Sequence, residues 1–349
     1  MLTLLAVLGR VLYRRSLPLP TLLVSVVLVG SVILALLLGS GAPQVGSAPA
    51  AAPAPPTSTP TATATCSPGW TIYPNPAPPG ESVLSGTVAL APNDLWAVGV
   101  YTATGIYTST TLTVHGDGTS WTYVPSPNPP SSSKAVLYGV AGVASNDVWA
   151  VGCYGSSCGQ TLTEHWDGTA WTIVPSPNFL NNNHLYAVTA IASNDVWAVG
   201  MSNSTGHPAS VAGLTEHWNG TSWSIVPIPS GTGTPLYGVA AVSANDVWAV
   251  GGGYPDQPAY GRAYIVHWNG SAWSTVSNPA NGGSSLHAVS VVSGNANDVW
   301  AVGYYGGSGT GQTLIEHWDG SAWTVVPSPN PGATTNLLYG VSGRASNDV

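Results

Sequence analysis

The fold of this chain is decided by a stretch that recurs along it, best seen at residues 146–171, which read NDVWAVGCYGSSCGQTLTEHWDGTAW. Its first motif, Asn-Asp-x-Trp-Ala-Val-Gly, is complete at five places and is begun at a sixth: Asn93, Asn146, Asn194, Asn245, Asn297 and Asn347. The Trp that closes the stretch recurs about every 51 residues, at positions 70, 121, 171, 223, 273 and 323. A repeat of this length is typical of propellers and solenoids.

Each repeat predicts four short β-strands. Asp-Gly or Asn-Gly between two apolar segments is the strongest short hairpin signal, because both central residues of a type I′ turn need a positive φ. The quoted repeat has this pair at Asp167 and Gly168, and the Pro-rich segment after it ends the pairing. In this repeat we expect strands at residues 137–144, 148–153, 161–166 and 171–174.

Five complete repeats and a partial unit at each end predict an all-β fold, a β-propeller of four-stranded antiparallel blades. The first partial unit is a lone fourth strand at 70–73, and the last is a first strand at 338–345 with the start of a second. Propellers commonly build one blade from both chain ends, so these pieces predict six or more blades. Because Val349 breaks off inside the motif, we expect the propeller at 69–349 to be truncated at its C-terminus.

The NDVWAVG, EHWDGTxW and PSPN segments resemble those of the kelch-type, galactose-oxidase-like propeller group, in particular repeat proteins exported by bacteria. The resemblance covers Trp70 to Val349, although the paired Gly of true kelch repeats is found only at Gly251 and Gly252. It implies the propeller fold. It implies no activity, since propellers host many unrelated functions.

Charge is scarce, with 6 Lys or Arg and 14 Asp or Glu among 349 residues. A chain without a basic footprint does not bind nucleic acid. Twelve of the acids hold repeat positions, where Asp serves as a turn residue. We find no Gly-x-Ser-x-Gly, HExxH or phosphate-loop motif, so we expect no catalytic residues and no cofactor.

The N-terminal region predicts a membrane anchor. Residues 17–38 form an apolar run long enough to cross a bilayer, and the Arg-rich segment 1–16 before it places the N-terminus in the cytoplasm. Residues 39–68, rich in Pro, Ala and Thr, predict an extended stalk that holds the propeller outside the cell. The alternative is a cleaved signal peptide and a secreted protein.

Five of the eight His and all fifteen Trp occupy repeat positions. Copies in separate blades point along separate radii, so we expect structural histidines paired with Glu or backbone, and no metal site. We expect the Trp residues to form the core and the contacts between blades. Cys153 and Cys158 flank the loop between the second and third strands of one blade, which predicts a disulfide outside the cell and leaves Cys66 unassigned.

Antiparallel strands place the short, nearly constant turns at one end of each blade and the variable loops at the other. Binding residues concentrate in loops held by a rigid scaffold. These loops carry most polar and aromatic residues outside the repeat, and we take as candidate ligand-binding residues Lys134, His184, His207, Asp256, Tyr260, Arg262, Tyr304 and Tyr305.

The sequence therefore predicts a membrane-tethered extracellular propeller that binds a protein or a glycan through its variable loops and catalyses no reaction. Two alternatives stay open. One is a lyase or hydrolase acting on extracellular polysaccharide, for which Asp256, Tyr260 and Arg262 cluster in one loop. The other is an adhesive or spacer with no defined ligand.

Overall fold

The computed structural model describes residues 73–349 apart from 75, 106–107, 131, 205–210, 230–233, 254–260, 281, 293–294, 307–310 and 333. The expected anchor, the stalk, Cys66 and nearly all of the expected strand at 70–73 therefore lie outside the described residues. Within the described part of the chain, no helix is both long enough and apolar enough to cross a membrane.

The described residues form twenty β-strands and no helix. Their bounds, in chain order, are β1(Gly80–Ala91), β2(Asp94–Ala103), β3(Ser109–Gly116), β4(Trp121–Tyr123), β5(Ala135–Ala144), β6(Asp147–Tyr154), β7(Gln160–Trp166), β8(Trp171–Ile173), β9(Asn182–Ala192), β10(Asp195–Asn203), β11(Val211–Trp218), β12(Trp223–Ile225), β13(Leu236–Ser243), β14(Asp246–Gly251), β15(Tyr264–Trp268), β16(Trp273–Val276), β17(Ser284–Val291), β18(Val299–Tyr305), β19(Gln312–Trp318) and β20(Trp323–Val325).

The strands form five four-stranded antiparallel sheets, each made of four strands consecutive in the chain. β5 to β8 match the four strands expected from the quoted repeat, with shifts of one or two residues at their ends. The predicted hairpin is present at Asp167 and Gly168, but the expected type I′ turn is not: Trp166 pairs with Trp171 across a four-residue loop, and of the two residues Gly168 alone has a positive φ, of 95°. The prediction of repeated four-stranded antiparallel blades is confirmed.

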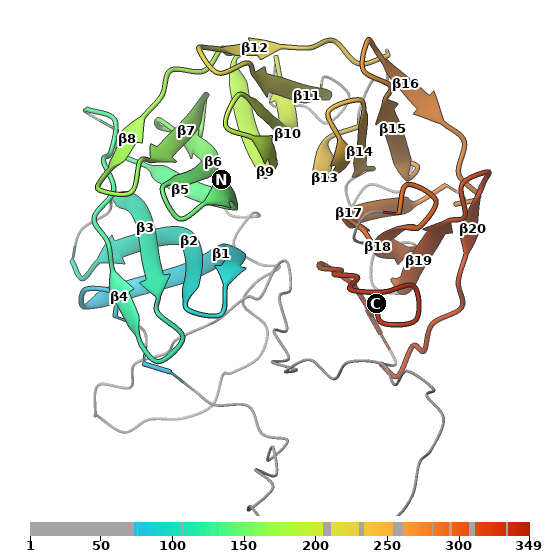
Figure 1. Ribbon diagram of the computed structural model, residues 1–349, viewed down its shortest axis with the longest axis horizontal. Coiled ribbons are helices and arrows are strands. Elements are labelled where there is room, and N and C mark those ends of the chain that lie inside the picture. The colour runs from blue at the N-terminus through green and yellow to red at the C-terminus, as the bar shows by residue number, and fades with distance from the viewer. Residues whose placement is uncertain are drawn as a thin grey trace, which may run out of the picture.

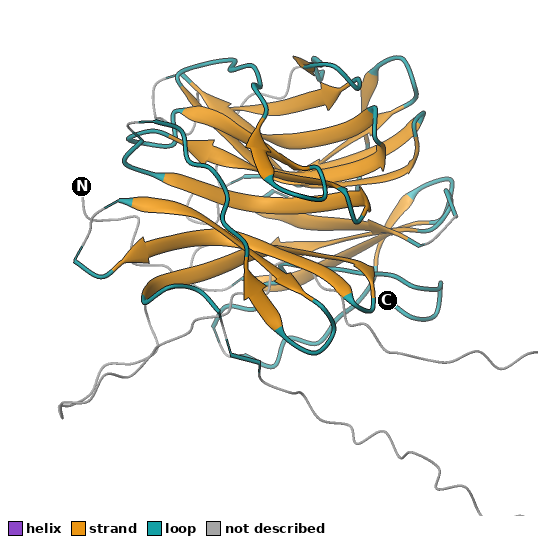
Figure 2. Cartoon of the chain, turned by 60° about the vertical axis from the view of Figure 1, so that its left-hand side comes forward, coloured by secondary structure: helices purple, strands orange, loops and turns teal. Residues whose placement is uncertain are grey.

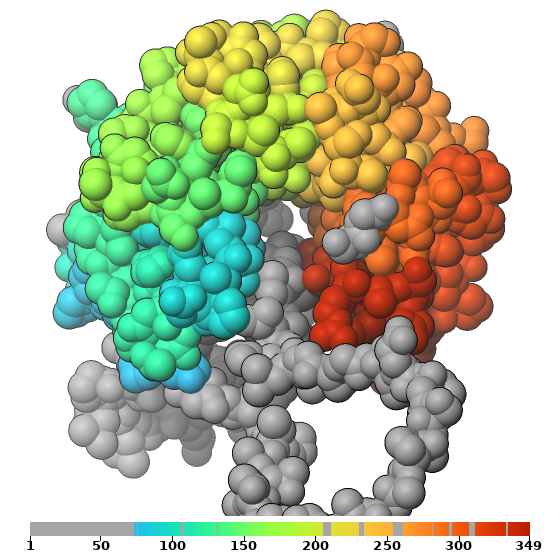
Figure 3. Space-filling view, in the orientation of Figure 1, coloured from blue at the N-terminus to red at the C-terminus, as the bar shows by residue number. Residues whose placement is uncertain are grey.

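The five sheets stand as blades around a common centre (Figure 1). The first strand of each blade lies innermost and the short fourth strand lies at the rim, as the labels of β9 and β12 show. Figure 2 shows the sheets stacked face to face when the molecule is turned. The described blades form an arc with a hollow at its centre and an opening between the first and last blades (Figure 3).

The expected strand at 338–345 is the one departure from the predicted pattern. Residues 338–344 have no strand conformation, and only an isolated bridge joins Ala345 to Asp348. In every complete blade the first strand pairs only with the second strand of the same blade. The second strands begin at the Asp of the motif or one residue after it, so in this sequence at most Asp348 and Val349 correspond to that partner. The prediction of a strand at 338–345 was wrong, because these residues have no adjacent strand to pair with.

Tryptophan fills the joints between blades. The Trp197 ring, from the second strand of its blade, has its centroid 4.9 Å from that of Trp268 and 5.2 Å from that of Trp273, both in the next blade. Trp96, Trp149 and Trp248 have equivalent neighbours in the blade that follows each of them. The prediction that the repeated Trp residues pack between blades is confirmed.

Each repeated histidine pairs with the aspartate of its own Asn-Asp turn. The His165 Nε2 lies 2.9 Å from the Asp147 Oδ1, and the His165 ring packs on Trp149. The same pair recurs in all five blades. The histidines are structural as predicted, but their partner is Asp, because the neighbouring Glu164 lies on the other face of the same strand.

Three repeated glutamates are fully buried between blades. Burial raises the pKa of the Glu164 and Glu216 carboxyls to about 8 and that of Glu316 to about 7. The Ser126 side chain, from the crossing between the first two blades, lowers the pKa of Glu164 only in part. Glu164 and Glu216 are therefore mainly protonated in the folded state at neutral pH, and all three carboxyls are protonated at mildly acidic pH.

The buried glutamates predict that stability falls as pH rises from about 5 to about 8. The buried glutamates keep their protons in the folded chain up to about pH 7 or 8, whereas glutamates of the unfolded chain release theirs above a pKa near 4.5. The resulting contribution to the free energy of unfolding is complete below about pH 4.5 and is lost as the pH rises through the folded-state pKa. We expect the urea midpoint of the wild type to fall over this range. The double variant Glu164→Gln, Glu216→Gln should show a clearly smaller decrease.

The exposed Glu81 provides the matched control, and Glu81→Gln should keep the wild-type dependence on pH. A double variant whose urea midpoint follows the wild-type pH profile would contradict the assignment of protonated glutamates.

Candidate functional site

The two ends of the blades differ in charge. The turn face holds the Asn-Asp turns and the Asp-Gly or Asn-Gly hairpins, and the loop face holds the loops between second and third strands and the crossings between blades. Among the described residues the loop face has only three charged side chains, Glu81, Lys134 and Arg262. The turn face carries nine aspartates: Asp94, Asp117, Asp147, Asp167, Asp195, Asp246, Asp298, Asp319 and Asp348.

Each innermost strand has a β-bulge close to the loop face. In β5, Leu137 pairs with Gly152 and Gly139 pairs with Val151, so Tyr138 has no partner across the ladder. A Cβ on Gly152 would lie 1.8 Å from the Val136 carbonyl oxygen. Any side chain in place of the Gly of the Ala-Val-Gly motif would clash with the backbone of the bulged first strand, so glycine is required at this position.

The bulge residues of four successive blades touch one another, the last of them touches Tyr339, and together they form what we call the aromatic arc. The centroid distances between neighbouring rings are 5.5, 5.4, 4.8 and 5.0 Å in chain order. Ser85 holds the equivalent position in the first blade. The first strands are the innermost strands of the blades (Figure 1), and the bulges lie close to their loop-face ends. Its members are Tyr138, Tyr186, Tyr237, His287 and Tyr339.

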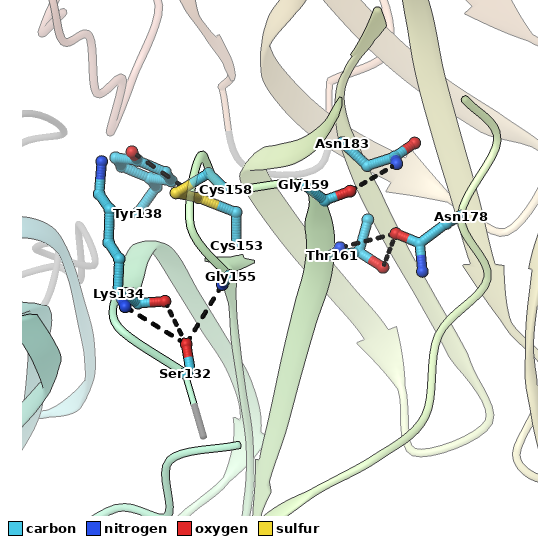
Figure 4. The surroundings of a disulfide bond; sticks show 10 residues. All are labelled: Ser132, Lys134, Tyr138, Cys153, Gly155, Cys158, Gly159, Thr161, Asn178 and Asn183. Atoms are coloured by element: carbon cyan, nitrogen blue, oxygen red, sulfur yellow. Dashed lines mark hydrogen bonds between the residues drawn. A yellow bond between two sulfur atoms is a disulfide. The ribbon is translucent and has the colours of Figure 1, made fainter. Parts of the chain in front are cut away.

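One wall of the arc combines Lys134, His184 and a disulfide. Cys153 and Cys158 are bonded, and the hydroxyl of Tyr138 lies 4.0 Å from the Cys153 Sγ (Figure 4). The His184 ring stacks on Tyr186 at 5.7 Å. Burial, with a smaller contribution from the Lys134 charge, lowers the pKa of His184 to about 4, so its imidazole is neutral at physiological pH.

Hydrogen bonds fix the loops behind this wall. The backbone N–H of Gly155 donates to the Lys134 carbonyl at 2.9 Å and to the Ser132 hydroxyl at 3.2 Å. The fully buried Asn183 donates to the Gly159 carbonyl at 2.9 Å, across the joint between two blades (Figure 4). Lys134 and His184 therefore stand on a rigid support.

The other candidate residues that the structure describes, Tyr304, Tyr305 and Arg262, differ in burial and in their neighbours. Tyr304 is buried, with its ring 5.4 Å from that of His287, so it supports the arc from behind. Tyr305 is 41% exposed, and its hydroxyl donates to Gln312 of the same blade. Arg262 is exposed on the loop face. His207, Asp256 and Tyr260 lie outside the described residues.

The aromatic arc is not among the features predicted from the sequence, although Leu-Tyr or Leu-His recurs in the first strand of the repeats, at Leu137, Leu185, Leu236, Leu286 and Leu338. The usable signal was the Gly at the end of each Ala-Val-Gly motif, since a glycine inside a strand often marks a bulge.

Cys153, Cys158 and His184 lie close enough together to suggest a metal site, with all candidate ligand atoms within 4.8 Å of one another. Zinc binds cysteine as thiolate. The two sulfurs are bonded to each other, so they offer no thiolates; the disulfide contacts the Tyr138 hydroxyl, and the His184 ring stacks on Tyr186.

The arc can bind but has little means of acid–base chemistry. Burial lowers the pKa of His287 to about 4 and raises that of Tyr138, so both groups are neutral near pH 7. The site therefore offers ring surfaces, phenolic hydroxyls and one ammonium group, from Lys134. Such groups orient and hold a ligand.

No protein-family model and no curated protein matches the sequence. Among solved structures, the chain is similar to a fucose-specific lectin from Aleuria aurantia at 14% identity and a TM-score of 0.48, over 75% of this chain and 85% of the lectin. It is similar to YCF48 from Cyanidioschyzon merolae at 15% identity and a TM-score of 0.40, over 76% and 73%. An ulvan lyase matches at 9% identity and a TM-score of 0.44, over 75% and 71%.

The bulge geometry predicts that Gly200→Ala disrupts the arc. A Cβ there would lie 1.8 Å from the His184 carbonyl oxygen, so the strand that carries Tyr186 must move. We expect a loss of about 1–3 kcal/mol in the free energy of unfolding, together with a changed near-UV circular dichroism spectrum. Gly282→Ala, where a Cβ would meet open space, is the control. Equal stability of the two variants would contradict the close approach.

Proposed function

We propose that this chain is a membrane-tethered extracellular β-propeller that binds a protein or a glycan through its loop face and catalyses no reaction. The observation that carries the proposal is the aromatic arc. Its five rings contact one another in series near the loop-face ends of the innermost strands, and they stand outside the apolar clusters that fill the joints between the blades.

The rings of the arc contact one another from blade to blade, but they stand apart from the Trp, Val and Leu side chains that fill the joints. Ser85 replaces the aromatic ring in the first blade without loss of the β1–β2 pairing, so the blade does not require a ring at this position. Aromatic side chains that a rigid scaffold does not require, placed near its loops, are typical of binding sites. The turn face, in contrast, repeats the same His–Asp pairs in every blade.

The tethering and the kelch-type assignment rest on sequence. The apolar run at 17–38, with Arg10, Arg14 and Arg15 before it, supports a single membrane-spanning anchor. The repeat motifs support membership of the kelch-type, galactose-oxidase-like group. A disulfide between Cys153 and Cys158 fits an oxidising exterior.

Two other functions compete with this proposal. A polysaccharide lyase or hydrolase would draw on Asp256, Tyr260 and Arg262, and polysaccharide turnover that is lost in Asp256→Ala would replace the binding proposal. An adhesive or spacer would bind no defined ligand. The aromatic arc favours a binding function over a spacer, because a spacer needs no ring surfaces around its hollow.

The binding proposal predicts that a ligand found by screening the full chain, in detergent, against glycans and cell-surface proteins will depend on the loop face. We expect Tyr237→Ala to weaken binding at least tenfold, measured by calorimetry, because it removes a central ring of the arc. Asp167→Asn, on the turn face, should bind as the wild type does. Binding that is lost in the turn-face variant but kept in Tyr237→Ala would refute the face assignment.

The topology proposal predicts that protease added to intact cells removes the propeller. An antibody against the propeller should lose its signal on shaved cells, while a cytoplasmic marker stays intact. A propeller that is digested only after lysis would contradict the outside location, and a propeller found in the medium would indicate a cleaved signal peptide.

A further inference from the structure

The aromatic arc is suited to the faces of sugar rings. A pyranose has an apolar C–H face and a rim of hydroxyls, and tyrosine offers both a ring surface and a hydroxyl. Tyr138, Tyr186 and Tyr237 follow one another at 5.5 and 5.4 Å between centroids, with interplanar angles of 60° and 39°, so the rings pack on one another. The parts of this series of rings that the mutual contacts leave uncovered offer an apolar surface to the C–H face of a sugar.

The charge at this rim selects against a cationic ligand. Lys134 lies close enough to His184 for its charge to oppose the protonation of that imidazole. Among the described residues no carboxylate forms an ion pair with Lys134. Among the described residues, nine aspartates lie at the opposite end of the blades, whereas the loop face carries two cations, Lys134 and Arg262, and one anion, Glu81, which favours an anionic ligand at the loop face.

The bulges also disfavour a peptide that adds as a strand. The innermost strands present a free edge to the central hollow, and such an edge would otherwise be a template for strand addition. At Tyr138, Tyr186 and Tyr237 the pairing register shifts, which breaks the regular row of backbone groups at the level of the arc. Side-chain stacking therefore remains the main mode of recognition here.

We propose that the aromatic arc binds a polyuronate, a glycan chain bearing carboxylates, with its sugar rings on Tyr186 and Tyr237 and a carboxylate on Lys134. This inference rests on the proposed binding function and specifies the ligand class for the same face. The uncharged His184 leaves Lys134 as the cation that recognises the carboxylate. A neutral glycan would use the same rings without the ion pair.

The test uses calorimetry on the full chain in detergent with two matched ligands, polygalacturonate and its methyl ester, and with alginate as a second polyuronate. The ester removes the charge and keeps the sugar backbone. We expect both polyuronates to bind, and the ester to bind at least tenfold more weakly than polygalacturonate. Lys134→Ala should abolish that preference, and Lys134→Arg should restore most of it.

Tyr186→Ala should weaken the binding of polygalacturonate and of its ester by similar factors of at least ten, whereas Tyr186→Phe, which keeps the ring, should stay within a few-fold of the wild type. Arg344→Ala, an exposed cation on the turn face, and Tyr123→Ala, on the outer strand β4, are the matched controls and should change neither affinity. Near-UV circular dichroism confirms that each variant is folded.

Four outcomes would overturn the inference. Equal binding of polygalacturonate and its ester would remove the role of Lys134. Binding of poly-glutamate with the same affinity as polygalacturonate would show that the site recognises negative charge alone, or a peptide, and not a glycan. Binding of a protein or neutral glycan at the loop face, without binding of either polyuronate, would leave the proposed function standing and reject the polyuronate. Polyuronate binding that Arg344→Ala abolishes and Tyr186→Ala spares would place the site elsewhere.

Discussion

The packing of tryptophan across the joint between blades is the contact on which the rest of this structure depends. The Trp197 ring contacts Trp268 and Trp273 of the following blade, and the same three-ring contact recurs at four joints. Because these rings are large and rigid, they fix the distance and angle between neighbouring sheets. Repetition of that angle brings the innermost strands together around one centre, and only then do side chains far apart in the sequence meet there.

Most of the fold could be predicted because the same pattern of strands and turns recurs in five complete repeats. The Asp167-Gly168 hairpin and the alternation around Trp149 locate the strands within one or two residues. The candidate site was predicted only in part. His184 and Tyr304 contact rings of the aromatic arc and Lys134 lies near His184, but their role in binding stays a prediction, and the expected alternation hid the bulge at Tyr138. A bulge depends on a backbone approach between two strands, and the spacing of apolar residues in one strand does not reveal it.

One position in the joints between blades is occupied by a polar side chain in some blades and by an apolar side chain in another. Glu164 faces the crossing that contains Ser126, whereas in the fourth blade Val266 packs with Ile228 of the preceding crossing. Each change on one side of the joint is matched on the other. A polar pair and an apolar pair of similar size both fill the space, as expected where packing density limits the choice. Glu164 is thus a neutral packing residue, whatever its formal charge.

The bulge has a consequence for how such a protein diversifies. The side chain of Tyr186 is displaced from the ladder, while its neighbour Leu185 stays in the joint. Exchange of the bulge residue therefore leaves the core unchanged, and Ser85 and His287 already occupy this position in other repeats. Duplicated repeats carry one such position each, so substitutions there can change specificity one ring at a time without a new scaffold.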